Sequence, residues 1–301
     1  MSKKNPGNIA ASVRQRILNK ARNDKRPFSE LLQYYAMERF LYRLAHSSHS
    51  DQFILKGALL FRAWHSPETR PTMDIDMLGK TSNEIGNILD KMRRIIDAGV
   101  VPDGLVFDPN SLSAERITED AVYEGIRIRF TGTLDTAQIP MQLDIGFGDV
   151  VFPKVSEADI PAILDFPAPR ILCYSKESAI AEKFEAMLKL GQLNSRMKDF
   201  YDIWYLARHF DFLGSDLSQA IQKTLDHRGT LLTSTVPIFE SSFSENKQAQ
   251  WAAFLRRIHT SDIPENFSEV TEFLQLFLEP IVKSLLGHTI PNRWHAPGPW
   301  T

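Results

Sequence analysis

Apolar residues recur every three or four positions near both ends of the chain, which is the period of an amphipathic helix. Near the start, this spacing predicts helices at residues 9–23 and 28–46, with Asn8 as a candidate N-cap of the first. Toward the other end, the same spacing predicts helices at residues 176–190, 199–210, 216–227, 245–259 and 268–286. Pro280 is expected to bend the last helix, because proline lacks the amide hydrogen that a helix interior needs.

Between these helical regions, apolar and polar residues alternate as they do in half-buried strands. Strands are predicted at residues 53–55, around residues 74–76, at 123–134 and at 141–149. Gly57 marks a turn that leads into a short helix at residues 58–64, and a longer helix is predicted at residues 83–97. Thr81 and Glu84 have the spacing of a capping box for that longer helix.

The order of these elements predicts an α+β protein, in which a mixed sheet with flanking helices is followed by a helical C-terminal domain. With 301 residues, of which 43% are hydrophobic, the chain can form one large domain or two of ordinary size. Residues 153–169 are rich in proline and are expected to lead out of the sheet region. The predicted domains are therefore residues 1–170 and 171–301.

Charge and cysteine content narrow the class of protein. The net charge of −2 argues against a protein that coats nucleic acid, although residues 1–26 hold eight Lys or Arg and one acid. That basic start is either a solvated helix or a contact for RNA. Cys173 is the one cysteine and cannot form an internal disulfide, and no apolar stretch reaches the roughly 18 residues of a membrane span. A cytoplasmic protein without a membrane segment is expected.

The stretch TRPTMDIDMLG carries the strongest chemical signal in the chain. In an extended segment Asp74 and Asp76 point to the same face, where two like charges repel unless a cation lies between them. Asp144 lies on the polar side of the strand MQLDIGFGD. Three carboxylates are typical ligands of Mg²⁺ or Mn²⁺ rather than of zinc. The alternatives are edge acids that discourage aggregation, for the pair, and a buried structural acid, for Asp144.

Three motifs resemble those of the AbiEii/AbiGii toxin family, which has the DNA polymerase beta-type nucleotidyltransferase fold. They are LKGALLF, RPTMDIDML and ESAIAEKFEAMLKLGQLNSRMKDFYDIWYLA, and the resemblance covers about residues 40–210. It implies a nucleotidyltransferase-like sheet in which a turn at Lys56, Gly57 and Ala58 holds the triphosphate of an NTP. The family's second glycine and the hydroxyl residue after it are replaced here by Ala58 and Leu59, which removes a hydroxyl that could contact phosphate and leaves the backbone amides of the turn available.

The resemblance also implies functional residues in the helical region. The matching positions make Lys183 a contact for the triphosphate and Asp199 its partner. Lys183 borders the apolar face of its predicted helix, and Asp199 lies at the edge of the next helix's apolar face, whereas Asp202 is expected to point further away. The alternatives are a solvated lysine and an aspartate that only caps its helix. Arg127 and Arg129 either meet phosphate or form a solvated strand face.

The function implied by the resemblance is Mg²⁺-dependent transfer of a nucleoside monophosphate from an NTP to an acceptor hydroxyl, with tRNA or another RNA as acceptor. The resemblance further implies a toxin of a type IV toxin–antitoxin and phage-defence system, restrained by a separately encoded antitoxin. Two alternatives stay open at this point. One is a non-catalytic protein that binds nucleotide or a partner on the same fold, and the other is an enzyme that modifies a small molecule such as an antibiotic.

Overall fold

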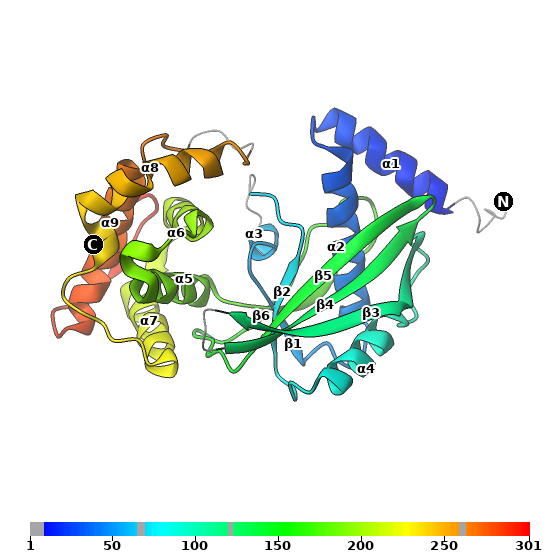
Figure 1. Cartoon of the computed structure of the whole chain (residues 1–301), viewed down its shortest axis with the longest axis horizontal. Helices are drawn as coiled ribbons and strands as arrows, with labels where there is room; N and C mark the ends of the chain where they lie inside the picture. Colours follow the sequence, from blue (N-terminus) through cyan, green and yellow to red (C-terminus); the bar gives the residue numbers. More distant parts are fainter. Residues whose placement is uncertain (1–8, 65–69, 120–122, 259–262) are drawn as a thin grey trace. The chain divides into compact units, whose positions relative to one another are not determined.

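The computed structural model describes residues 9–64, 70–119, 123–258 and 263–301 (Figure 1). The chain divides into two compact units. Unit 1 comprises Met1–Gly148 and Ser156–Cys173, and unit 2 comprises Asp149–Val155 and Tyr174–Thr301. None of the described helices is long and apolar enough to cross a membrane.

Unit 1 contains a seven-stranded sheet with the order β3-β4-β5-β2-β1-β7-β6 (Figure 1). The strands are β1 Phe53–Lys56, β2 Ile75–Gly79, β3 Leu105–Glu119, β4 Tyr123–Leu134, β5 Ala137–Phe147, β6 Ser156–Asp159 and β7 Arg170–Cys173. Pairs β2–β5 and β1–β7 are parallel, and the other neighbouring strands are antiparallel. The predicted mixed sheet is therefore confirmed.

The helices of unit 1 begin and end close to the predicted positions, with one difference at a cap. They are α1 Ile9–Asn23, α2 Phe28–Ala45, α3 Leu60–Ala63 and α4 Ile85–Ile96. The predicted capping box of α4 is wrong, because the helix begins at Ile85 and Glu84 is itself the N-cap residue, with no side-chain cap bond. The candidate N-cap Asn8 lies outside the described residues.

Two strands of the sheet contradict the expectation that the proline-rich segment leaves the sheet region. β6 lies inside that segment and pairs with β7, which in turn pairs with β1. Both strands have only four residues, and β6 is at the edge of the sheet, where proline is tolerated nearby because fewer backbone bonds are needed. The other edge strand, β3, was not predicted; its register shifts between Asp108 and Ser113.

Alternation along the central strands separates an apolar face from a polar one. On β4 the residues Ile126, Ile128 and Phe130 are buried, and the ring of Phe130 contacts Phe40 of α2 at a centroid distance of 5.4 Å. Arg127 lies between these residues on the opposite face. Helix α2 therefore covers the apolar face of the sheet, and the charged residues of the central strands project from the other face.

Unit 2 is mainly helical, as predicted. Its helices are α5 Lys176–Leu190, α6 Met197–His209, α7 Gly214–Arg228, α8 Ser241–Leu255 and α9 Phe267–Leu285. Each begins and ends within four residues of the predicted bounds, and Pro280 lies inside α9. The two-residue strands β8 Phe212–Leu213 and β9 Arg293–Trp294 pair near the end of the chain. Trp294 is fully buried and contacts Phe277 and Trp300, so the C-terminal segment is part of the core of this unit.

Candidate active site

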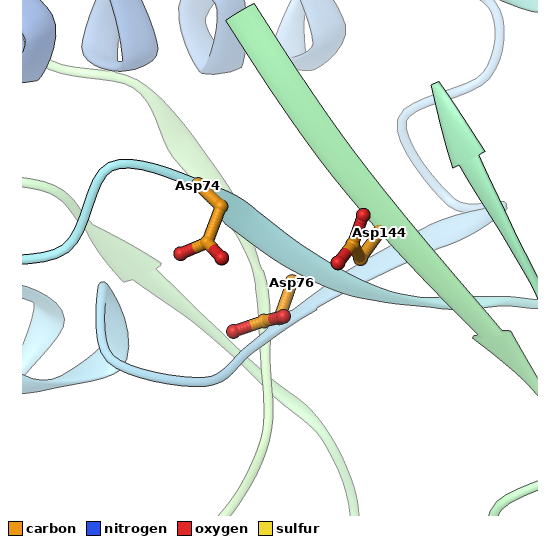
Figure 2. A group of neighbouring side chains, drawn as sticks. All are labelled: Asp74, Asp76 and Asp144. Carbon is orange, nitrogen blue, oxygen red and sulfur yellow. The ribbon is translucent and has the colours of Figure 1, made fainter. Parts of the chain in front are cut away.

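The structure brings the three predicted carboxylates of unit 1 together. Asp74, Asp76 and Asp144 each offer one oxygen, and these oxygens lie within 4.8 Å of one another (Figure 2). All three side chains are half-buried. Because β2 and β5 are parallel, Asp76 lies directly opposite Asp144, and Asp74 comes just before the start of β2. The spacing of these oxygens is small enough for one cation to contact all three residues.

Charged residues form a row across five neighbouring strands. The register places Glu115 opposite Arg127, Arg127 opposite Asp144, Asp144 opposite Asp76, and Asp76 opposite Lys56. Residues directly opposite each other in a sheet project from the same face. The two central carboxylates are therefore flanked by a lysine on one side and an arginine on the other. We call these five side chains the charged row.

Asp74 is positioned by side chains of α2 that the sequence did not reveal as site residues. The Thr72 hydroxyl donates to Asp74 Oδ1 at 2.5 Å, and the Thr72 amide donates to the Tyr34 hydroxyl at 3.1 Å. The Gln33 side chain donates to the Met73 carbonyl at 3.2 Å. The apolar sequence around buried Gln33 and Tyr34 gave no indication of this role. Met73 is 55% exposed, whereas Ile75, two residues further along, is fully buried.

Gly57 permits Asp76 to lie against the turn after β1. Its φ of +75° is in the left-handed region that favours glycine. A Cβ at this position would lie 2.0 Å from Asp76 Oδ2, which is far inside contact distance. The predicted turn is therefore present. Both its positive φ and the close approach of Asp76 require a glycine at this position.

The helix predicted after this turn is shorter than expected. It was predicted at residues 58–64, and α3 spans only Leu60–Ala63. Ala58 and Leu59 precede it with buried side chains, and Lys56 is also buried. Ala58 and Leu59 have no polar side-chain atom, so at these two positions the backbone amides are the groups that could contact an anion.

The guanidinium of Arg127 donates two hydrogen bonds to the carboxylate of Asp144. Its Nε donates to Oδ1 at 2.8 Å, and its terminal nitrogen donates to Oδ2 at 2.6 Å. The hydrogen bond to Asp144 raises the pKa of Arg127, so the guanidinium stays charged. Arg129, two residues along the same strand, pairs instead with Glu115 at 2.7 Å, and both of those side chains are half exposed. Of the two arginines, only Arg129 thus fits the solvated strand face that the sequence allowed.

Unit 2 contains a second charged cluster, which lies within its helices. Lys183 Nζ lies 3.3 Å from Asp199 Oδ1 and 3.0 Å from Asp202 Oδ2. Arg196 Nε donates to Asp199 Oδ2 at 2.6 Å. The expectation that Asp202 points away from this group is wrong, because residues three apart on a helix lie on the same side. Both aspartate side chains are fully buried, so Lys183 has two buried carboxylate partners.

The two alternatives for these residues, a solvated Lys183 and an Asp199 that only caps its helix, do not describe their surroundings. The Lys183 side chain is 16% exposed and ion-paired, so it is not a solvated lysine. Helix α6 has Arg196 as its N-cap residue, and Asp199 lies in its first turn. The Asp199 carboxylate accepts from the side chains of Lys183 and Arg196. Its contacts are those of a buried ion pair rather than of a helix cap.

Comparison with known proteins identifies the family. The family model described as nucleotidyl transferase AbiEii toxin, type IV TA system, matches residues 39–273. No functionally curated protein matches the sequence. Among solved structures, one Helicobacter pylori protein provisionally assigned as a nucleotidyltransferase is similar, with 17% identity, a TM-score of 0.44, and coverage of 86% of this chain and 98% of that one.

JHP933 from Helicobacter pylori is also similar, with 15% identity, a TM-score of 0.43, and coverage of 82% of this chain and 90% of that one. The family assignment depends on the sequence match, which covers most of the chain and includes the residues of both charged clusters. The chain therefore belongs to the AbiEii nucleotidyltransferase toxin family of type IV toxin–antitoxin systems.

Proposed function

We propose that the protein transfers a nucleoside monophosphate from an NTP to an acceptor hydroxyl, with Mg²⁺ or Mn²⁺ as cofactor. The observation that carries this proposal is the convergence of Asp74, Asp76 and Asp144, whose oxygens lie within 4.8 Å of one another. The donor set is made of carboxylate oxygens only, which suits these hard cations. Divalent ions bound at such a site activate the attacking hydroxyl and neutralise the pyrophosphate that leaves.

Each residue of the site has a proposed role in this transfer. The acceptor oxygen forms a bond to the α-phosphorus, and the bond from that phosphorus to the bridging oxygen of the pyrophosphate breaks. Asp74 and Asp76 would hold the metal, and Asp144 would complete the site and help to remove the proton of the attacking hydroxyl. The turn at Lys56, Gly57 and Ala58 would contact the triphosphate through backbone amides and the lysine charge.

Lys183 and Asp199 keep the roles that the family motif implies. Lys183 would contact the triphosphate as a point charge, and Asp199 would hold it in place. The ion pairs of Lys183 with two buried carboxylates support a fixed position for its ammonium group. Asp202 enters this proposal on equal terms with Asp199, because its distance to Lys183 is no longer.

The acceptor and the biological setting are the finer parts of the proposal. We infer an RNA acceptor such as tRNA, a cytoplasmic location, and a role in abortive infection, with a cognate antitoxin that restrains the toxin. Membership of a type IV toxin family supports the antitoxin and the nucleotide substrate. The predicted domains 1–170, nucleotidyltransferase-like, and 171–301, helical, are part of the same proposal.

The decisive experiment incubates the protein with each radiolabelled NTP, Mg²⁺ and total tRNA. Asp76→Asn should reduce label transfer by at least about 10³-fold, because a metal ligand contributes several kcal/mol to such a transition state. Glu115→Gln is the matched control, since it removes a carboxylate from the outer end of the same charged row and should leave transfer unchanged.

Other results would favour the competing functions. Nucleotide binding without transfer to any acceptor would support a non-catalytic nucleotide-binding protein. Transfer to a small alcohol, but not to tRNA, would support an enzyme that modifies small molecules. Equal transfer by the wild type and Asp76→Asn would contradict the proposed metal site.

A further inference from the structure

Arg127 is hydrogen-bonded to the carboxylate of Asp144, which the proposed metal site needs as its third ligand. Its two hydrogen bonds, of 2.8 and 2.6 Å, reach both oxygens of Asp144. Asp144 is one of the three residues whose oxygens lie within 4.8 Å of one another. A guanidinium and a divalent cation are therefore directed at the same side chain.

The sheet itself holds this arginine at Asp144. The register of β4 and β5 places the two residues directly opposite each other, so their side chains project side by side from one face. Gln142, two residues before Asp144, also donates to Oδ2, at 3.4 Å. The side chains of Arg127 and Asp144 are only 30% and 17% exposed, which limits competition from water. The contact is thus built into the strand pairing.

Two cations at one carboxylate repel each other, so the arginine and the metal compete. A planar guanidinium that bonds both oxygens satisfies the lone pairs that face it and neutralises part of the charge that attracts a metal ion. The described contacts of Asp74 include the hydroxyl of Thr72, which carries no charge and does not compete in this way. Asp144 and Asp74 therefore differ in how readily they can accept a divalent ion.

We propose that Arg127 is a positioning residue that withholds Asp144 from the divalent metal until an anionic phosphate draws the guanidinium away. This inference rests on the proposed function, because it concerns the metal site of that reaction. In the free protein, Asp74 and Asp76 would take up an ion without full help from Asp144. A guanidinium binds phosphate, as it binds carboxylate, through two parallel hydrogen bonds, and both the NTP and an RNA acceptor carry phosphate.

Mn²⁺ binding, followed by the electron paramagnetic resonance signal of the free ion, tests the proposal without any turnover. Arg127→Gln should bind Mn²⁺ at least about fivefold more tightly than the wild type. Arg129→Gln is the matched control, because it removes the same charge from the same strand face but its partner is Glu115. That control should change the affinity by less than about twofold.

A double-mutant cycle then shows whether the effect passes through Asp144. In an Asp144→Asn background, the further change Arg127→Gln should give no gain in Mn²⁺ affinity. A gain that persists there, or an Arg127→Gln protein that binds Mn²⁺ no more tightly than the wild type, would overturn the proposal. If Arg127→Gln does not fold, Arg127→Lys replaces it, and a smaller gain is expected because lysine cannot bond both oxygens at once.

The release step has its own test. A non-hydrolysable NTP analogue should bring the Mn²⁺ affinity of the wild type to within about twofold of Arg127→Gln, and an RNA with a 5′-phosphate, added instead, shows whether the acceptor does the same. If neither closes the difference, release by phosphate is wrong. Asp76→Asn separates this failure from a failure of the proposed function, since undiminished Mn²⁺ binding by that variant would mean that the carboxylates are not a metal site at all.

Discussion

The two charged clusters of this protein use the same kinds of side chain in opposite ways. In unit 1, three half-buried carboxylates lie within 4.8 Å of one another. In unit 2, two fully buried aspartates lie within 3.3 Å of Lys183, and one of them also binds Arg196. The first cluster gathers three like charges, of which Asp144 is paired with Arg127, whereas the second pairs each negative charge with a positive one.

This difference indicates which cluster is suited to bind a cation and which is suited to hold its own charged groups in place. Carboxylates held close together repel, so their arrangement costs free energy that a bound cation can recover. Buried opposite charges are stable only while both partners remain, because the loss of one leaves an uncompensated charge away from water. The cluster of unit 1 is therefore expected to respond to metal ions, and that of unit 2 to hold its lysine rigidly.

The largest expected effect comes from breaking the cluster of unit 2. Asp202→Ala removes one of the two buried partners of Lys183 and should lower the free energy of unfolding by about 3–5 kcal/mol. Asp74→Ala in unit 1 loses a hydrogen bond but also relieves the repulsion among the three carboxylates. It should change the free energy of unfolding by less than about 1 kcal/mol. Urea unfolding of both variants without metal measures the contrast. Equal losses of unfolding free energy in the two variants would contradict this difference between the clusters.

A smaller loss of stability is expected from a change at Gly57, in the turn against which Asp76 lies. Gly57→Ala places a methyl group where Asp76 Oδ2 now lies and forces a positive φ on alanine, which should cost about 1–2 kcal/mol. The displaced carboxylate should also weaken Mn²⁺ binding by about tenfold or more. Gly86→Ala is the control, because that helical glycine has open space around it and its replacement should stabilise α4 by up to about 1 kcal/mol. Unchanged Mn²⁺ affinity in Gly57→Ala would mean that Asp76 does not need this position.

The smallest expected effect at neutral pH concerns Cys173, which reports on unit 1 alone. Burial on β7 raises the pKa of its thiol to about 12, from a usual value of 9.0. Below about pH 9 the thiol is protonated in both the folded and the unfolded chain, so it does not alter stability. Between about pH 9 and pH 12 the unfolded chain loses this proton first, so stability should fall as the pH rises.

Reaction with a thiol reagent at pH 8 measures how well the folded chain protects the Cys173 thiol. A thiol reagent should label native wild type and Asp74→Ala equally slowly, and both should label rapidly once unfolded in urea. Faster labelling of native Asp74→Ala would show that the carboxylate cluster is needed to keep unit 1 closed, contrary to the contrast between the clusters.

Local patterns in the sequence were sufficient for most elements and for the central chemistry. Alternation on two separate strands placed Asp76 and Asp144 on polar faces, and the structure sets them directly opposite each other. Helical spacing located the five helices of unit 2. These predictions succeeded because strand and helix periods are properties of neighbouring residues, which a sequence displays directly.

Other features depended on partners that are distant in the chain. The short strands β6 and β7 lack a pattern of their own and are held by pairing with each other and with β1. The pairing of Arg127 with Asp144 depends on the register between β4 and β5, and a slip of one residue would put the arginine on the other face. The sequence left the role of that arginine open for this reason.

The sequence by itself determined the residue types and their local faces: the D-x-D pair, the third carboxylate, the glycine turn and the helical lysine. Only the tertiary structure decided which of these meet. Strand order brought the three carboxylates together, strand register set an arginine against one of them, and helix packing put Asp202 beside Lys183. The reason is physical: a periodic pattern sets the direction of a side chain, but its partner depends on which distant segment packs against it.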